Sequence, residues 1–198
     1  MRYKGTSASA GIGIGKAVIV EEVRLVIAMQ AVTDVEEEVQ RFKGALDETI
    51  KATEKLAEDL ATRVGEKEAE IMQGHMMLLA DPMLTGEIEN SIRNDSVNSE
   101  YAIENVCNMY ADMFASMGDE LMQQRATDMR DIKTRMQQML MGIQSVDISS
   151  LPEGSIIVAK DLTPSMTAGI NPAKVTGIVT ELGGKTSHSA ILARALEI

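Results

Sequence analysis

Aromatic residues and cysteine are scarce: the sequence has no tryptophan, two phenylalanines, three tyrosines and one cysteine, Cys107. A single cysteine excludes an intrachain disulfide, so we expect a reducing compartment and a cytoplasmic protein, with Cys107 as a small core residue. With so few aromatic rings, the core is expected to consist of aliphatic side chains and the 15 methionines, a composition that favours packed helices. No apolar run reaches membrane-spanning length, so no membrane is expected as a partner.

Basic residues are also fewer than acidic ones. The 19 Lys and Arg residues face 30 Asp and Glu residues, which gives a formal net charge of -11. Nucleic acids and anionic membranes are bound by basic surfaces, so the charge argues against both as partners. It is compatible with a small basic protein as a partner. The 198 residues are enough for one large domain or two small ones.

A long middle segment, residues 33–142, has the apolar periodicity of helices. The first helix is predicted to begin at a capping box formed by Thr33 and Glu36 and to end at Gly65. Its apolar seam has steps of three and four residues: Val35, Val39, Phe42, Leu46, Thr49, Thr53, Leu56 and Leu60. Further helices are predicted over about 66–80, from Pro82 with Asp81 as N-cap, over 99–117 and over 118–142. Short connections predict an antiparallel bundle.

The two ends of the chain have a different pattern, with alternating strands and helices. The predicted elements are a strand ending near residue 20, a strand over 155–159, a helix over 163–169, a strand over 175–180 and a helix over 187–196. Such alternation is typical of an α/β unit. We therefore predict an α/β domain formed by residues 1–30 and 145–198, into which residues 31–144 are inserted as an all-helical bundle.

A glycine-rich stretch, Gly11-Ile-Gly-Ile-Gly15, precedes the first predicted strand. A dinucleotide-binding loop needs different glycine spacing, and it follows a strand and opens a helix. This stretch does neither, so we do not predict a nucleotide site there.

Two histidines are present, His75 and His188. His75 lies in a helical pattern among Met and Leu, where a structural role is expected. His188 follows two glycines at the start of the last predicted helix, where free backbone N–H groups attract anions. A neutral imidazole is a competent nucleophile near neutral pH. Its candidate support residues are Gly183, Gly184, Lys185, Thr186, Ser187 and Ser189.

These residues permit two interpretations. In the first, His188 accepts a phosphoryl group, because such transfer depends mainly on positioning and on donors for the phosphoryl oxygens. In the second, the Ser and Thr hydroxyls merely cap a helix, for which the same residue types are favoured. Spacing alone does not decide between them, and it indicates no metal ligand set.

The stretch Gly183-Gly-Lys-Thr-Ser-His-Ser-Ala-Ile-Leu-Ala-Arg194 resembles the phosphohistidine signature of the Enzyme I family, the phosphoenolpyruvate-protein phosphotransferases of bacterial sugar uptake. Related dikinases and phosphoenolpyruvate synthases carry a similar motif. Residues 161–168, 74–79 and 125–132 resemble further Enzyme I segments and favour that family. The resemblance covers nearly the whole chain. It implies an α/β phosphohistidine (swivelling) domain with an inserted helical bundle.

The resemblance also implies a mechanism. In that family a phosphoryl group passes from phosphoenolpyruvate to Nε2 of the motif histidine, here His188, and then to a histidine of the small phosphocarrier protein HPr. Thr167 is implied to orient the imidazole through a hydrogen bond, and the helical insertion is implied to bind HPr. The implied HPr contacts are Glu66, Glu68, Met77, Leu78, Leu84 and Arg125.

The full-length enzymes of this family add a C-terminal barrel that binds phosphoenolpyruvate and Mg²⁺ and forms the dimer. Nothing in this sequence resembles the barrel. We therefore expect a fragment with an α/β domain incomplete at its C-terminal end, no cofactor of its own, no native dimer and no independent use of phosphoenolpyruvate. Mg²⁺ is expected only for the full-length enzyme. Two alternatives stay open: an HPr-binding module without catalysis, and the phosphohistidine domain of a dikinase-like relative.

Overall fold

The chain folds into two compact units. The computed structural model describes residues 5–21, 23–144, 146–185 and 187–198. The unit that contains the sheet, called the α/β unit below, comprises Met1–Val23, Glu58–Ala69 and Val146–Ile198. The other, called the helical unit, comprises Arg24–Ala57 and Glu70–Ser145.

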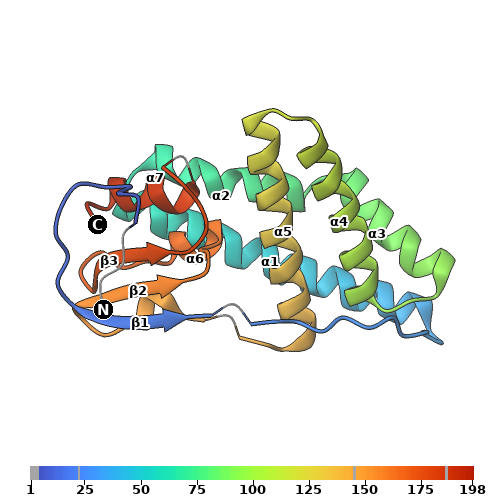
Figure 1. The fold of residues 1–198 in the computed structure, drawn as a ribbon. Helices are drawn as coiled ribbons and strands as arrows, with labels where there is room; N and C mark the ends of the chain where they lie inside the picture. Colours follow the sequence, from blue (N-terminus) through green and yellow to red (C-terminus); the bar gives the residue numbers. More distant parts are fainter. Residues whose placement is uncertain (1–4, 22, 145, 186) are drawn as a thin grey trace. The chain divides into compact units, whose positions relative to one another are not determined.

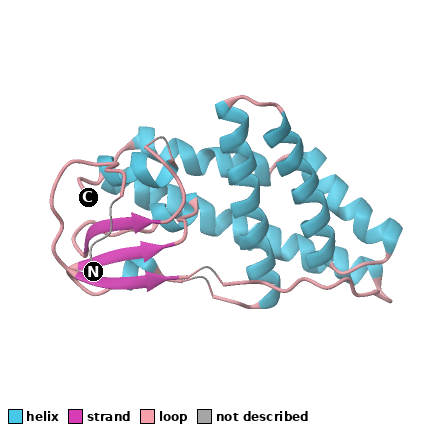
Figure 2. Cartoon of the chain, in the orientation of Figure 1, coloured by secondary structure: helices cyan, strands magenta, loops and turns pink. Residues whose placement is uncertain are grey.

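Within the described ranges, the α/β unit has a three-stranded parallel sheet with the order β1-β2-β3 (Figures 1 and 2). The strands are β1 (Lys16–Val20), β2 (Ser155–Ala159) and β3 (Val175–Thr180). Val and Ile dominate them, as expected for strands of a parallel sheet. The β2–β3 connection carries the short helix α6 (Pro164–Ala168), and α7 (His188–Ala195) follows β3.

The glycine-rich stretch before β1 lies tightly against the ends of the other strands. A Cβ added at Gly13 would lie 2.3 Å from the carbonyl oxygen of Thr176, and one at Gly15 would lie 2.1 Å from that of Gly154. No side chain fits at these distances, so only glycine allows the backbone to pass here. The glycines therefore have a packing role, consistent with the argument against a nucleotide loop.

The predicted helices are present, with their boundaries close to those expected. They are α1 (Val35–Arg63), α2 (Glu66–Leu79), α3 (Pro82–Asp95), α4 (Ser99–Ser116) and α5 (Glu120–Met141) (Figure 1). The Asp81 carboxylate accepts the N–H of Met83 at 2.8 Å, which confirms the N-cap predicted before Pro82. None of the helices in the described ranges is both long and apolar enough to cross a bilayer.

The predicted capping box at the start of α1 was wrong. The Asp34 carboxylate, rather than the Thr33 hydroxyl, caps the helix by accepting the N–H of Glu37 at 3.0 Å. The Glu36 carboxylate does not bond to the start of the helix. Instead it accepts a hydrogen bond from Nε of Arg93 at 3.0 Å. Thr and Asp both cap helices, but Asp is the more strongly preferred N-cap residue, in agreement with the observed cap.

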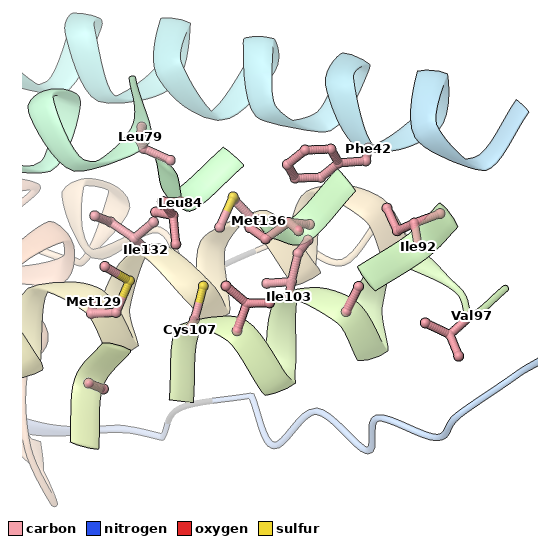
Figure 3. Close-up of a cluster of buried hydrophobic side chains, with 14 of the residues drawn as sticks. Phe42, Leu79, Leu84, Ile92, Val97, Ile103, Cys107, Met129, Ile132 and Met136 are labelled. Carbon is pink, nitrogen blue, oxygen red and sulfur yellow. The ribbon is translucent and has the colours of Figure 1, made fainter. Parts of the chain in front are cut away.

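The core of the helical unit joins all five helices (Figure 3). Phe42 from α1, Ile92 from α3 and Ile103 from α4 are completely buried, and α5 adds Ile132. Methionines fill part of this core, as the composition predicted. Cys107 lies in this core at 1% exposure, which confirms that it is a core residue. Its burial raises the pKa of the thiol to about 12.

The two observed units differ from the predicted domain division in two segments. Residues 24–30 belong to the helical unit, where the N–H of Asn98 donates to the carbonyl of Gln30 at 3.0 Å. The segment Glu58–Ala69, predicted within the helical insertion, belongs to the α/β unit. Helices α1 and α2 thus each contribute residues to both units.

Two adjacent residues of α3 provide a test of the helical core. Leu84 is 2% exposed and Met83 is 68% exposed. We expect Leu84→Ala to lower the free energy of unfolding by about 2–5 kcal/mol, because it removes buried methyl groups and leaves a cavity. Met83→Ala is expected to change it by less than about 0.5 kcal/mol. Urea unfolding followed by circular dichroism measures both, and equal losses would contradict this packing.

Candidate functional site

His188 is the first residue of α7, and its side chain is half-buried. Ser187 is the N-cap of this helix: its hydroxyl donates to the carbonyl of Gly184 at 2.9 Å and accepts the N–H of Ala190 at 3.3 Å. The predicted start of the last helix is therefore confirmed. The histidine occupies the first turn, near the N–H groups that give a helix end its partial positive charge.

Hydrogen bonds to backbone carbonyls anchor the loop before His188 near both of its ends. At its beginning, the N–H of Leu182 donates to the carbonyl of Lys160 at 2.8 Å. Near its end, Nη1 of Arg194 donates to the carbonyl of Lys185 at 2.9 Å and to that of Ala8 at 3.1 Å. Between these anchors, Gly183 has φ of +97°, a backbone conformation that favours glycine.

Thr167 lies in α6, which packs against α7. The side chain is 1% exposed, and its hydroxyl donates to the carbonyl of Thr163 at 2.8 Å. A threonine hydroxyl has one proton, so with this bond in place its oxygen can only accept a further hydrogen bond. An acceptor of this kind suits the protonated nitrogen of a neutral imidazole.

The other predicted support residues differ in exposure and in their hydrogen bonds. Gly184 and Lys185 are exposed, and an added Cβ at Gly184 would meet no atom within 4 Å. Ser189 is 6% exposed and its Oγ lies 3.0 Å from Oγ of Ser187, so it shapes the start of α7. Thr186 lies outside the described residues.

Two residues at the site were not singled out from the sequence, namely Arg194 and Asp161. Arg194 holds the loop through the carbonyl of Lys185. The sequence signal that could have identified it is its position as a cationic residue in the last turn of α7. The Asp161 carboxylate accepts the N–H of Leu162 at 2.8 Å and would lie 3.9 Å from a Cβ at Gly183. It therefore lies next to the loop, although nothing in its local sequence indicates that position.

Three of the predicted HPr contacts have side chains at least partly at the surface of the helical unit. Met77 is 70% exposed, whereas Leu78 is half-buried and packs against the core. Arg125 of α5 is half-buried, with Nη1 3.4 Å from where a Cβ at Gly74 would lie. The absence of a side chain at Gly74 thus lets Arg125 lie across α2.

Two other predicted contacts lie in the α/β unit, and one lies in the core. Glu66 is exposed and Glu68 is half-buried, both in the first turn of α2. Leu84 is a core residue at 2% exposure. The structure therefore argues against Leu84 as an HPr contact, because its side chain is buried where α3 packs into the bundle.

His75 is completely buried in the helical unit. Its Nε2 lies 3.2 Å from Oδ1 of Asp128 and its Nδ1 lies 3.9 Å from Oδ2 of Asp131. No solvent reaches this ring, which supports the structural role expected for it. His188 is therefore the one of the two histidines that a protein partner can reach.

Comparison with known proteins identifies the family. A family model described as "PEP-utilising enzyme, N-terminal" matches residues 4–125. The chain belongs to this family. A second model, "PEP-utilising enzyme, mobile domain", matches residues 151–198, which include β2, α6, β3 and α7. The first match covers β1 and most of the helical insertion, and the second covers the part of the α/β unit that contains His188.

Curated relatives agree with this assignment. The phosphoenolpyruvate-protein phosphotransferases of Listeria monocytogenes and Bacillus subtilis are 44% and 43% identical to the chain over 195 residues. These matches cover 98% of the chain and 34% of each relative, so the chain spans about a third of the length of the curated relatives it matches.

Solved structures show the same fold. A solution structure of an Enzyme I protein has a TM-score of 0.84 and 40% identity, over 98% of this chain and 79% of that one. A structure described as "N-terminal domain of Enzyme 1 - Nitrogen" has a TM-score of 0.67 and 25% identity, over 96% of this chain and 79% of that one. The predicted fold class, an α/β part with an inserted helical bundle, and the resemblance to Enzyme I are confirmed.

Two neighbouring glycines test the loop. Gly183→Ala is expected to lower the stability of the α/β unit by about 1–2 kcal/mol, because alanine disfavours a positive φ. Gly184→Ala is expected to have an effect below about 0.5 kcal/mol, because that position has open space and no positive φ. Thermal unfolding of both variants measures the difference, and a Gly184→Ala loss as large as that of Gly183→Ala would refute this account of the loop.

Proposed function

We propose that this chain carries the phosphohistidine of a phosphoenolpyruvate-protein phosphotransferase: His188 accepts a phosphoryl group at Nε2 and exchanges it with a histidine of HPr during sugar uptake in the cytoplasm. The observation that carries the proposal is the position of His188 in the first turn of α7, behind an anchored loop. Helix N-termini favour negatively charged groups such as phosphate.

Thr167 supports a specific tautomer of the imidazole. Its hydroxyl proton is engaged by the carbonyl of Thr163, so its oxygen is left to accept. Accepting the Nδ1–H of His188 would leave the lone pair on Nε2, the nitrogen proposed to react. In the forward reaction this lone pair forms the N–P bond while the P–O bond to enolpyruvate breaks. In the next step the N–P bond breaks as the HPr histidine attacks phosphorus.

No step through a metal is assigned to this chain. Among the residues that the structure describes, no group of three or more His, Cys, Asp and Glu side chains could hold a metal ion. Mg²⁺, the phosphoenolpyruvate site and the dimer are expected only of full-length relatives, of which this chain spans about a third.

HPr is proposed to bind the helical unit at exposed residues of α2 and α5. Met77 offers a flexible apolar side chain at the surface, and Arg125 lies across α2 at Gly74. A formal charge of -11 favours association with a basic partner and makes it sensitive to salt. Glu66 and Glu68 remain candidates for contacts contributed by the α/β unit.

Phosphate exchange with HPr tests the role of His188. Purified chain mixed with phosphorylated HPr is expected to gain one acid-labile, base-stable phosphate, located at Nε2 of His188 by NMR. The variant His188→Gln is expected to gain none, although His75 is still present. Labelling that persists in His188→Gln would refute the assignment.

Two further outcomes of this experiment would favour the alternatives. HPr binding without any labelling of the wild-type chain would indicate a binding module without catalysis. Neither binding nor labelling would favour the dikinase-like alternative, in which a small molecule takes the place of HPr.

A matched pair of methionines tests the binding surface. Met77→Lys is expected to weaken HPr affinity at least tenfold, because it replaces an apolar contact with a charge that repels a basic partner. Met139→Lys is expected to stay within about twofold, since Met139 is also exposed but lies about 21 Å farther along α5 than Arg125. Isothermal titration at two salt concentrations measures both, and equal effects would place the surface elsewhere.

A further inference from the structure

Arg63, the last residue of α1, donates hydrogen bonds to backbone carbonyls at the end of α6. It belongs to the α/β unit, and its guanidinium donates from Nη1 to the carbonyl of Ile170 and from Nη2 to that of Ala168. Its Nε donates to the carbonyl of Asp59 at 3.1 Å, within α1. All three nitrogens are therefore engaged, and the two terminal ones reach residues more than 100 positions away along the chain.

The two distant carbonyls lie at the carboxyl end of α6. This helix has five residues, too few to be stable without tertiary contacts. The last carbonyls of a helix lack partners within it, and a cation at that end stabilises it. The N–H of Gly169 bonds back to the carbonyls of Ser165 and Met166. The carbonyl of Thr167 accepts the N–H of Ile170, and Arg63 donates to the carbonyls of Ala168 and Ile170, at the end of the helix and just beyond it.

Thr167 lies directly before Ala168, so the end of α6 that Arg63 holds is also the part that carries the Thr167 hydroxyl. Its side chain is buried at 1% exposure and bonded to the carbonyl of Thr163. The Thr167 oxygen therefore moves only when α6 moves. Since α6 packs against α7, a shift of α6 changes where that oxygen lies relative to the first turn of α7.

We propose that Arg63 is a positioning residue for His188: by holding the carboxyl end of α6, it keeps the Thr167 hydroxyl where it fixes the tautomer of the imidazole. This inference rests on the proposed phosphohistidine role. Arg63 does not touch the reacting atoms. The planar fork of a guanidinium can donate to two carbonyls at once, whereas a lysine ammonium on a flexible stem cannot reproduce that geometry.

The tautomer of His188 provides a readout that a change in stability alone does not alter. In ¹⁵N-labelled wild-type chain at pH 9, where an ordinary imidazole is neutral, the Nδ1–H form of His188 is expected to dominate. In Arg63→Met the ratio of the two tautomers is expected to fall at least fivefold. Phosphate transfer from phosphorylated HPr is expected to slow about tenfold to a hundredfold, because misplacement of a supporting group by an ångström has effects of that size.

Arg93→Met is the matched control. Arg93 is also a surface arginine with several bonds, but these go to Glu36 and Glu89 in the helical unit. It is expected to keep the wild-type tautomer ratio and transfer rate, and HPr affinity is expected to stay unchanged in both variants. A folded Arg63→Met chain with the wild-type ratio and rate would overturn the proposal.

A second variant keeps the test decisive if Arg63→Met does not fold. Arg63→Lys retains the charge and most of the stem, and it is expected to show the same changes in smaller measure; a wild-type ratio and rate in this variant would also overturn the proposal. If the wild-type chain accepts no phosphate from HPr, the proposed function fails. The tautomer ratio then still shows whether Arg63 controls the His188 ring.

Discussion

The α/β unit depends on the pairing of β1 with β2, because this pairing joins the two ends of the chain. Lys16 to Val20 lie opposite Ser155 to Ala159 in continuous register, although roughly 130 residues separate the strands in sequence. Closing a loop of that length costs on the order of 4 kcal/mol of chain entropy, and this cost grows only slowly with length. A large helical insertion is therefore tolerated, provided that the strand contacts are good. The glycines at 13 and 15 provide the close approach that these contacts need.

Parallel pairing also determines where the site forms. The chain leaves β2 and β3 at the same edge of the sheet, so the segments that follow them meet there. The N–H groups of Glu181 and Leu182 bond to the carbonyls of Ala159 and Lys160, which joins the two exits directly. The segment after β2 leads to α6 and Thr167, and the segment after β3 leads to α7 and His188. The two residues implied to act together thus reach one place because two parallel strands end side by side.

The helices, the strands and the start of α7 could be predicted from the sequence because their signals are local. Asp81 before Pro82 and Ser187 before His188 act within three residues of themselves. The predictions that failed involve a choice between neighbouring residues or contacts between distant segments. Thr33 and Asp34 are both residue types that cap helices, and only the structure shows that Asp34 is the cap. Met83 and Leu84 are neighbours with similar side chains, and only the packing of α3 decides that Leu84 is buried. The assignment of Glu58–Ala69 to the α/β unit likewise depends on contacts such as those of Arg63 with α6.

The same distinction explains why the motif around His188 was ambiguous by itself. Its glycines and hydroxyl residues shape a loop and cap a helix, and in the structure Ser187 and Ser189 do that. Helix caps with these residue types are common, and most of them carry no chemistry. Under the proposed function the imidazole needs in addition a partner that selects one tautomer, and Thr167, proposed for that role, lies on another element. Thr167 lies in a five-residue helix that needs tertiary contacts to be stable. The reactivity proposed for the motif would therefore depend on contacts between segments far apart in the sequence, which a local sequence pattern does not reveal.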